Sequence, residues 1–471
     1  MGGDSRSGHE TEQSKSLAAE LNLDNSGNRN SDRHLSEILR LAVPAMLALA
    51  SQPLLSIGDT AMIGRLGVEP LAARAIGAAL IGGIYWIFAF LTFGTTTLIG
   101  HHFGANDARA CGETYLHALF VALVGGAAMA VSGFFFAEEL YRWMGADKAV
   151  VDQGKGYFRI YIAGAPFTLI LLASVGFFRG IQNTKTPMFI AFLANGLHLL
   201  LDYGLIYGNL GLPGLGLRGA AIAAWIAQLT GASVSLMVFF TSRRTAAYRA
   251  VGWRISMAKL RPLFRIGGDL ALRTGALRLS LIFATATAAR MGAAILSAYE
   301  IAFQLFMLCS DVIDGLAVAG QALAAKHLGA HRNETAFRMG RTLIVCGAVA
   351  GLAFGALFIL AEPSIIRFFT KSPEVIAAIG GGLFLLVALM QPLNGIVFVI
   401  DGLLIGARDT RFLMWAMLAG GCGVFIPISW LSLNYGWGLA GILIGLSALM
   451  LWRCATNVFR FTGRKWTADT P

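Results

Sequence analysis

Long apolar stretches separated by short polar segments run through the chain from Leu35 to about residue 457. About 20 apolar residues in a helix cross the roughly 30 Å of a bilayer's hydrocarbon core. Twelve stretches are about that long or longer, so the pattern predicts twelve membrane-spanning helices. We place them near 35–64, 71–100, 112–137, 157–180, 187–208, 216–241, 261–289, 296–325, 338–361, 375–405, 411–431 and 436–457.

The second half of the chain repeats the first at an offset of 225 or 226 residues. The matched pairs are Arg40 and Arg265, Arg65 and Arg290, His102 and His327, and Gly180 and Gly406. An even number of spans in each half makes the halves parallel repeats, which is a common plan of secondary transporters. We therefore expect an all-α integral membrane protein with two parallel six-helix lobes related by pseudo-two-fold symmetry.

The same pattern divides the chain into five segments. Residues 1–33 are polar, lack the apolar run of a signal peptide, and are expected to form a disordered cytoplasmic tail. The two lobes are expected at 34–241 and 261–457. Between them lies a basic linker, 242–260, and after them a short tail, 458–471. Loops on the side of the linker and termini hold more Lys and Arg than the opposite loops, so this side is predicted to face the cytoplasm.

Composition and motifs exclude several classes of protein. Hydrophobic residues make up 56% of the chain and charged residues only 13%, unlike a soluble domain. The net charge of +11 is spread over short loops, which favours contact with membrane lipids and predicts no nucleic-acid partner. The five cysteines show no paired spacing, so neither a disulfide nor a metal site is expected. Since HExxH, DDxxD and GxSxG motifs with a suitable base are missing from the sequence, we do not expect an enzyme.

Two acidic residues of the first half lie inside predicted spans, where charge is costly and usually functional. Asp59 is about 7.5 Å, and Asp202 about 9 Å, inward from the outer end of its span at 1.5 Å per residue. His198 and Asn195 precede Asp202 by one and two helical turns on the same face. Burial and like charge favour the protonated form of a carboxylate, so these four residues form a candidate proton or cation site.

Pro44 lies about four turns below Asp59 in the first span. Because proline removes a backbone hydrogen bond, this span is a candidate kinked helix whose bend could depend on the charge of Asp59.

Acidic and basic residues of the second half are predicted at similar cytoplasmic depth. Asp269 and Arg273 are spaced as an i, i+4 pair, and Asp311, Asp314 and Asp401 lie nearby in depth. We expect Arg273 to have a carboxylate partner across the bundle. Structural pairing and a role in transport both remain open for this cluster.

The chain resembles the multidrug and toxic compound extrusion (MATE) transporters, and within them the DNA-damage-inducible protein F (DinF) branch. The resemblance covers everything after residue 34. Its motifs are DTAMIGRLG at Asp59, GANDARA after the second span, RGIQNTKTP at Arg179, NGLHLLLD ending at Asp202, GGDLALR at Asp269 and IDGLLIGARDTR at Asp401.

This resemblance implies an antiporter in the bacterial inner membrane that exports organic compounds, driven by inward H⁺ or Na⁺. It implies a first-lobe site at Asp59 and Asp202, with Pro44 as the bend point. His198 replaces an Asn that the family often has, which favours H⁺ as the coupling ion over Na⁺. The nearest match to a helix-10 Asp of some members is Asn394. We expect no cofactor, a small-molecule substrate of cationic or amphipathic character, and a monomer.

Several alternatives stay open at this point. A flippase for lipids or lipid-linked oligosaccharides belongs to the same superfamily, but it would favour a basic cavity over first-lobe acids. A Na⁺-coupled exporter and an exporter of organic acids are further readings within the family. The duplication, and acids at different depths in the two lobes, disfavour a channel.

Overall fold

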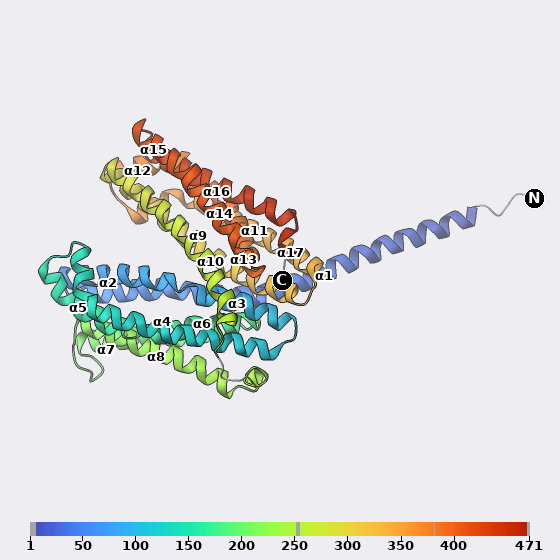
Figure 1. Cartoon of the computed structure of the whole chain (residues 1–471). Helices are drawn as coiled ribbons and strands as arrows, with labels where there is room; N and C mark the ends of the chain where they lie inside the picture. The colour runs from blue at the N-terminus through green and yellow to red at the C-terminus, as the bar shows by residue number, and fades with distance from the viewer. Residues whose placement is uncertain (1–5, 251–254, 381, 469–471) are drawn as a thin grey trace, which may run out of the picture.

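The computed structural model describes residues 6–250, 255–380 and 382–468, with side chains from His34 onwards. All regular structure in these ranges is helical (Figure 1). The helices form two bundles, one from each half of the chain, which confirms the predicted all-α fold with two lobes.

The first lobe contains eight α-helices and is followed by a short 3₁₀ helix in the linker. Several begin at an acidic cap: Asp107 accepts a hydrogen bond from the Ala110 amide at 2.8 Å, and Asp147 one from Val150 at 2.9 Å. The elements are α1 Arg6–Gly64, α2 Val68–Ile87, α3 Phe90–Gly104, α4 Ala108–Trp143, α5 Lys148–Ile162, α6 Ala165–Gly180, α7 Lys185–Tyr207, α8 Leu217–Thr241 and η1 Arg243–Tyr248.

The second lobe repeats this order, with a π-helical turn within its fifth span. Such turns insert an extra residue into the helical repeat. The elements are α9 Met257–Arg290, α10 Ala293–Gly329, α11 Asn333–Phe369, α12 Pro373–Ile379, α13 Gly382–Gly406, α14 Thr410–Gly420, η2 Gly421–Phe425, α15 Ile426–Asn434, α16 Gly438–Thr462 and the terminal α17 Lys465–Ala468.

Most predicted spans are found as helices long and apolar enough to cross a membrane. Within the described residues there are ten, counting α2 with α3 and α14 with α15, and an eleventh if α5 and α6 form one span bent by 46°. The remaining predicted span is α9, a helix of 34 residues that carries several basic residues. It takes the place in the second lobe that α1 takes in the first.

The N-terminal segment differs from the prediction of a disordered tail. The structure describes residues 6–33 as helix, continuous with the first span in α1. No proline precedes Pro44, so the backbone hydrogen bonds of the helix continue without a break. This extension projects away from both lobes (Figure 1).

The pseudo-two-fold relation is visible in the contact between α3 and α10. Gly104 lies so close to α10 that a Cβ atom there would be 1.9 Å from the Lys326 carbonyl oxygen. Gly329 lies equally close to α3, with a corresponding distance of 2.0 Å to the His101 carbonyl oxygen. Adding 225 to 104 and 101 gives 329 and 326, so one contact is made twice across the axis.

The lobes meet at the end where α3, α6, α10 and α13 finish, and they diverge towards the opposite end (Figure 1). Thr97 donates to the Ile405 carbonyl at 3.0 Å, and His101 hydrogen-bonds the Gly406 carbonyl at 2.9 Å. Lys326 pairs with Glu37 of α1 at 2.5 Å. The cytoplasmic side predicted from the loop charges is therefore the closed side.

Candidate functional site

Asp59 of α1 forms an ion pair with Arg74 of α2, which links the first span to the second. Arg74 of α2 donates to Asp59 Oδ2 from Nε at 3.0 Å and from Nη2 at 2.7 Å. The two side chains are only 11% and 13% exposed. Asp59 Oδ1 is buried and has no hydrogen-bond partner among the described residues. A single guanidinium therefore stabilises the ionised form of this carboxylate in a largely dry site.

Asp202 of α7 is fully buried, and neither of its carboxylate oxygens has a hydrogen-bond partner in the described part of the chain. The nearest basic group is His198, whose Nε2 lies 3.5 Å from Asp202 Oδ2. An ionised carboxylate without donors is very costly in such a place. Asp202 is therefore suited to hold a proton, alone or shared with the imidazole.

The other first-lobe residues predicted for the site lie on the facing helices. Asn195 Nδ2 donates to the hydroxyl of Ser51 on α1 at 2.9 Å, so it links α7 to α1. Pro44 is buried within α1 and does not end the helix. A second proline, Pro53, lies between Ser51 and Asp59 and removes a further backbone donor from this helix.

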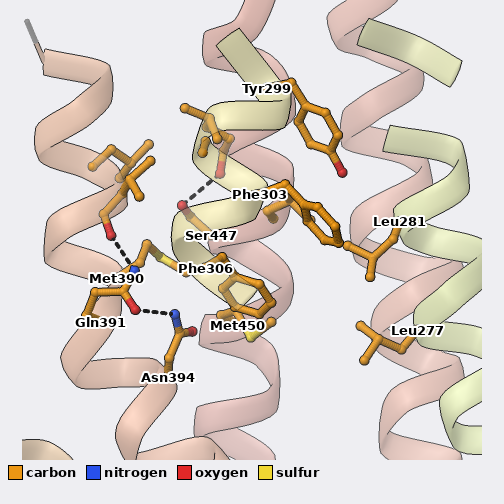
Figure 2. A pocket seen from close by; sticks show the side chains of 15 residues that line it. Leu277, Leu281, Tyr299, Phe303, Phe306, Met390, Gln391, Asn394, Ser447 and Met450 are labelled. Atoms are coloured by element: carbon orange, nitrogen blue, oxygen red, sulfur yellow. Dashed lines mark hydrogen bonds between the residues drawn. The ribbon is translucent and has the colours of Figure 1, made fainter. Parts of the chain in front are cut away.

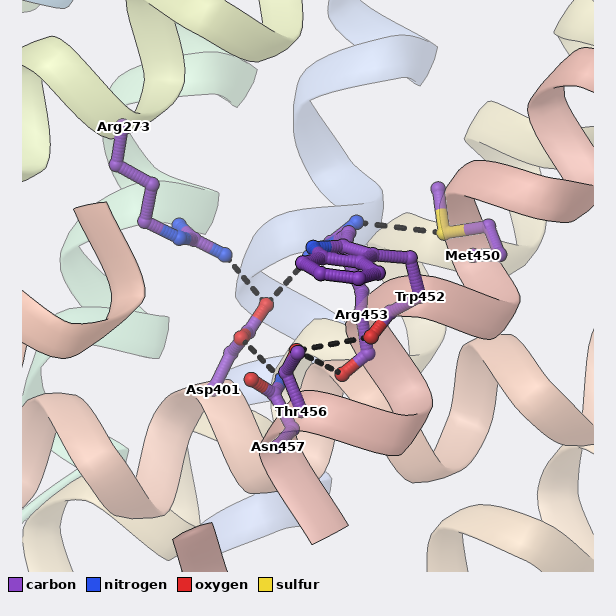
Figure 3. A network of polar contacts seen from close by, with 7 residues as sticks. All are labelled: Arg273, Asp401, Met450, Trp452, Arg453, Thr456 and Asn457. Atoms are coloured by element: carbon purple, nitrogen blue, oxygen red, sulfur yellow. Dashed lines mark hydrogen bonds and ion pairs between the residues drawn. The ribbon is translucent and has the colours of Figure 1, made fainter. Parts of the chain in front are cut away.

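The predicted second-lobe cluster is organised around Asp401 of α13 (Figure 3). Arg273 of α9 and Arg453 of α16 both donate to Asp401 Oδ2, the latter at 2.5 Å. Asn457 donates to Asp401 Oδ1 at 2.8 Å. Arg273 does have a carboxylate partner across the bundle, as expected. Arg453 is 4% exposed and completes the network.

Other members of that predicted cluster have separate surroundings. Asp269 does not pair with Arg273, since its Oδ2 accepts a hydrogen bond from Thr410 at 2.7 Å. Asp314 is an exposed residue of α10 that lies near enough to Arg273 and Asp401 to interact with them electrostatically. Asn394 is two turns before Asp401 on α13, where its Nδ2 donates to Gln391 at 3.3 Å. Asp269 and Arg273 therefore bond to residues on other helices, although their i, i+4 spacing would allow them to pair with each other.

The described parts of both lobes contain no candidate metal site. Within the described residues, no three His, Cys, Asp or Glu side chains are grouped closely enough to hold a metal ion. At Asp59 the position next to the carboxylate is occupied by a guanidinium.

Comparison with known proteins settles the family. The MatE family model matches residues 44–204 and 276–431, which is most of both lobes. The chain belongs to the MatE family. Members of this family are transporters and not enzymes, so the protein is an integral membrane transporter of the MATE type.

Relatives of this MATE transporter come from plants and bacteria. It is 28% identical over 446 residues to Protein DETOXIFICATION 44, chloroplastic, of Arabidopsis thaliana, covering 91% of this chain and 82% of the relative. It is 26% identical over 428 residues to DNA damage-inducible protein F of Escherichia coli K12, covering 88% and 91%. It is 27% identical over 438 residues to the probable multidrug resistance protein NorM of Burkholderia pseudomallei, covering 89% and 92%.

Solved MATE structures share the fold. One in the bent conformation superimposes with a TM-score of 0.84 at 22% identity, covering 93% of this chain and 97% of that one. An outward-facing multidrug resistance MATE transporter superimposes with a TM-score of 0.82 at 22% identity, covering 92% and 96%. These matches agree with twelve helices in two lobes, and with lobes that diverge at one end.

Sequence reasoning missed Arg74 in this MATE transporter. The residue lies near the start of the second span. An arginine at such a position is usually interpreted as extending its side chain to the membrane surface. A signal was present: Arg74 and Asp59 are 15 residues apart across a short turn, so two antiparallel helices can bring them level.

Proposed function

We propose that this MATE transporter is a proton-coupled antiporter that exports organic cations or amphipathic compounds by alternating access. The observation that carries the proposal is Asp202, a fully buried carboxylate for which His198 is the one basic partner within ion-pair distance in the described part of the chain. A group of this kind gains or loses a proton as water reaches it. Protons therefore fit the site better than Na⁺, which would require several oxygen ligands.

Arg74 suggests how proton and substrate exclude each other. A proton on Asp59 neutralises the carboxylate, and Arg74 is then a cation without its counter-ion in a largely buried place. An organic cation near ionised Asp59 would likewise compete with Arg74 for the carboxylate. Proton and substrate thus prefer different states of one ion pair, which is the requirement for coupling. Pro44 and Pro53 weaken the hydrogen bonding of α1, the helix that would have to respond.

The test is transport in proteoliposomes under a pH gradient with no Na⁺ present. Asp202→Asn should remain folded and lose gradient-driven export, because its amide no longer takes up a proton. Asp152→Asn is the matched control, since Asp152 is an exposed carboxylate on α5 that pairs with Lys155 of the same helix. Export that requires Na⁺, or an Asp202→Asn variant that exports at the wild-type rate, contradicts the proposal.

We further propose that the transporter lies in a bacterial inner membrane as a monomer without a cofactor, with both termini in the cytoplasm. Ala149 of α5 and Ala247 of η1 are exposed alanines on opposite sides of the predicted membrane. A cysteine introduced at 149, in a variant whose native cysteines are replaced, should react with an impermeant maleimide added to intact cells. A cysteine at 247 should react only after lysis, and the reverse pattern would invert the topology.

A further inference from the structure

Two cavities of the molecule differ in the charge of their linings. The cavity in the second lobe, between α9, α10, α13 and α16, is lined by apolar, aromatic and uncharged polar side chains (Figure 2). A second cavity, of about 470 Å³, lies at the closed end, where α3 and α10 finish. Four of its lining side chains are basic and the rest are uncharged. The basic ones are Lys326, His327, His331 and Arg332.

We propose that this basic cavity binds a phosphate group from the cytoplasm, and that the bound phosphate holds the two lobes together. Residues 103–106 of the first lobe and 326–332 of the second both line it. Among them are Gly104 and Gly329, the glycines of the contact that is repeated across the pseudo-two-fold axis. The cavity therefore lies at the axis, between the lobes. A ligand that binds only while this end is closed favours the closed state.

The loop after α10 has the turn of the loop after α3 but different chemistry. Asp107 caps α4 by accepting a hydrogen bond from the Ala110 amide at 2.8 Å. Arg332 lies 225 residues later, at the start of α11, and its side chain makes no capping hydrogen bond. An arginine at this position offers the first amides of α11 no acceptor and places a cation at the positive end of the helix dipole. A bound anion would offset both effects, because it accepts from backbone amides and neutralises the guanidinium.

His327 provides a second, independent observation. It lines the cavity and is 6% exposed, and its Nε2 is buried without a hydrogen-bond partner among the described residues. Leaving a buried polar atom unpaired is unfavourable, and an imidazole N–H can donate to a phosphate oxygen. Lys326 already pairs with Glu37 at 2.5 Å, but its ammonium group has three N–H donors and can serve a second acceptor. A phosphate, with several charged oxygens, matches this set of donors.

Two sources carry this chemistry, a soluble phosphate of the cytoplasm and the headgroup of an anionic phospholipid. The position at the axis favours the soluble source, since membrane lipids surround the lobes from outside. Inorganic phosphate is therefore the first probe. Its binding would be measured with radiolabelled phosphate by a scintillation proximity assay, with the protein in nanodiscs of zwitterionic phosphatidylcholine and with ionic strength held constant by chloride.

The decisive variant gives the second-lobe loop the residues of the first. His331→Asn with Arg332→Asp makes residues 329–332 identical to 104–107. The variant should fold, because His331 and Asn106 share the left-handed backbone, with φ of 56° and 58°, and aspartate is a favourable cap. It should bind phosphate about tenfold more weakly or worse, because at least one charge-assisted hydrogen bond is lost. Arg411→Asp is the matched control, since Arg411 is exposed in the first turn of α14, outside the cavity.

Each outcome of this binding experiment decides the inference. Saturable phosphate binding by wild type and Arg411→Asp, but not by the loop variant, supports a soluble source. If phosphate does not bind, native mass spectrometry in phosphatidylglycerol nanodiscs tests the lipid source. Phosphatidylglycerol retained by wild type and lost from the loop variant would assign the cavity to a headgroup. Equal binding of either probe by wild type and loop variant, or binding of neither probe, overturns the inference.

The effect on the lobes is measured without a proton gradient, so it does not depend on the proposed coupling. A cysteine at position 97, in a variant without native cysteines, reports opening on the cytoplasmic side by its reaction with maleimide. Phosphate at ten times its Kd should slow this reaction about tenfold, and it should leave the rate unchanged when the loop substitutions are added. Phosphate that binds without slowing the reaction would contradict the claim that it holds the lobes together.

Discussion

The two lobes are built alike but carry different chemistry at equivalent positions. Adding 225 to Asp59 and Arg74 gives Ala284 and Tyr299, so an ion pair in one lobe is replaced by a small residue and an aromatic one in the other. The contact of α3 with α10, by contrast, is kept on both sides of the axis. The contact that holds the scaffold is shared by the two lobes, whereas the side chains of the two interiors differ.

The carboxylates of the lobes also differ in how they are neutralised. Asp401 accepts from two guanidinium groups and one amide, Asp59 from a single guanidinium, and Asp202 from no donor among the described residues. More donors favour the charged form more strongly. Asp202 therefore has the fewest donors of the three, whereas Asp401 ties α9, α13 and α16 together through its partners.

The largest effect is expected from removing that anion. Asp401→Leu leaves Arg273 and Arg453 as buried cations without their carboxylate, which costs about 3–5 kcal/mol or more. The folded yield, measured by fluorescence-detected size-exclusion chromatography, should fall to near background. Arg273→Leu should lower it less, because Arg453 and Asn457 still hold Asp401. Equal yields for Asp401→Leu and wild type would mean that the network is not structural.

A smaller effect is expected at the first-lobe pair. Arg74→Leu leaves ionised Asp59 without its cation and should reduce the folded yield at neutral pH by breaking a largely buried pair. The double variant Asp59→Asn with Arg74→Leu should recover the yield, since no charge remains unpaired, yet show no export driven by a pH gradient. Gradient-driven export by the double variant would show that the pair of Asp59 and Arg74 does not couple export to protons.

Residues that act through one helix were predictable, and residues that act through a partner helix were not. Asp202, His198 and Asn195 share a helical face, so their spacing alone placed them together. Arg74 and Arg453 gain their roles from contacts with α1 and α13, which no local pattern encodes. Asp269 and Arg273 show the limit of such predictions. Their i, i+4 spacing predicts a pair within α9, but each side chain bonds to a residue on another helix.

The fold was predictable for a similar reason. Length and hydropathy determine which segments can cross a bilayer, and the repeat with Gly180 and Gly406 indicated six spans in each lobe. Hydropathy is less informative for α9, whose basic residues lower its apolar character. Composition also predicted disorder for residues 1–33, although the part from Arg6 on is described as helix.

The smallest effect is expected at a contact between the lobes that does not follow the pseudo-two-fold symmetry. His101 hydrogen-bonds the Gly406 carbonyl, whereas its equivalent Lys326 turns instead to Glu37, with both side chains about one-third exposed. A pair this accessible contributes up to about 1 kcal/mol, so losing it should increase the inward-open population at most about fivefold.

Glu37→Gln should raise the reaction rate of a cysteine at position 97 with maleimide on the cytoplasmic side, in a variant without native cysteines. The exchanged pair Glu37→Lys with Lys326→Glu should restore the wild-type rate. If the exchanged pair reacts as fast as Glu37→Gln, then the ion pair does not hold the lobes closed, and the hydrogen bond of His101 does so without it.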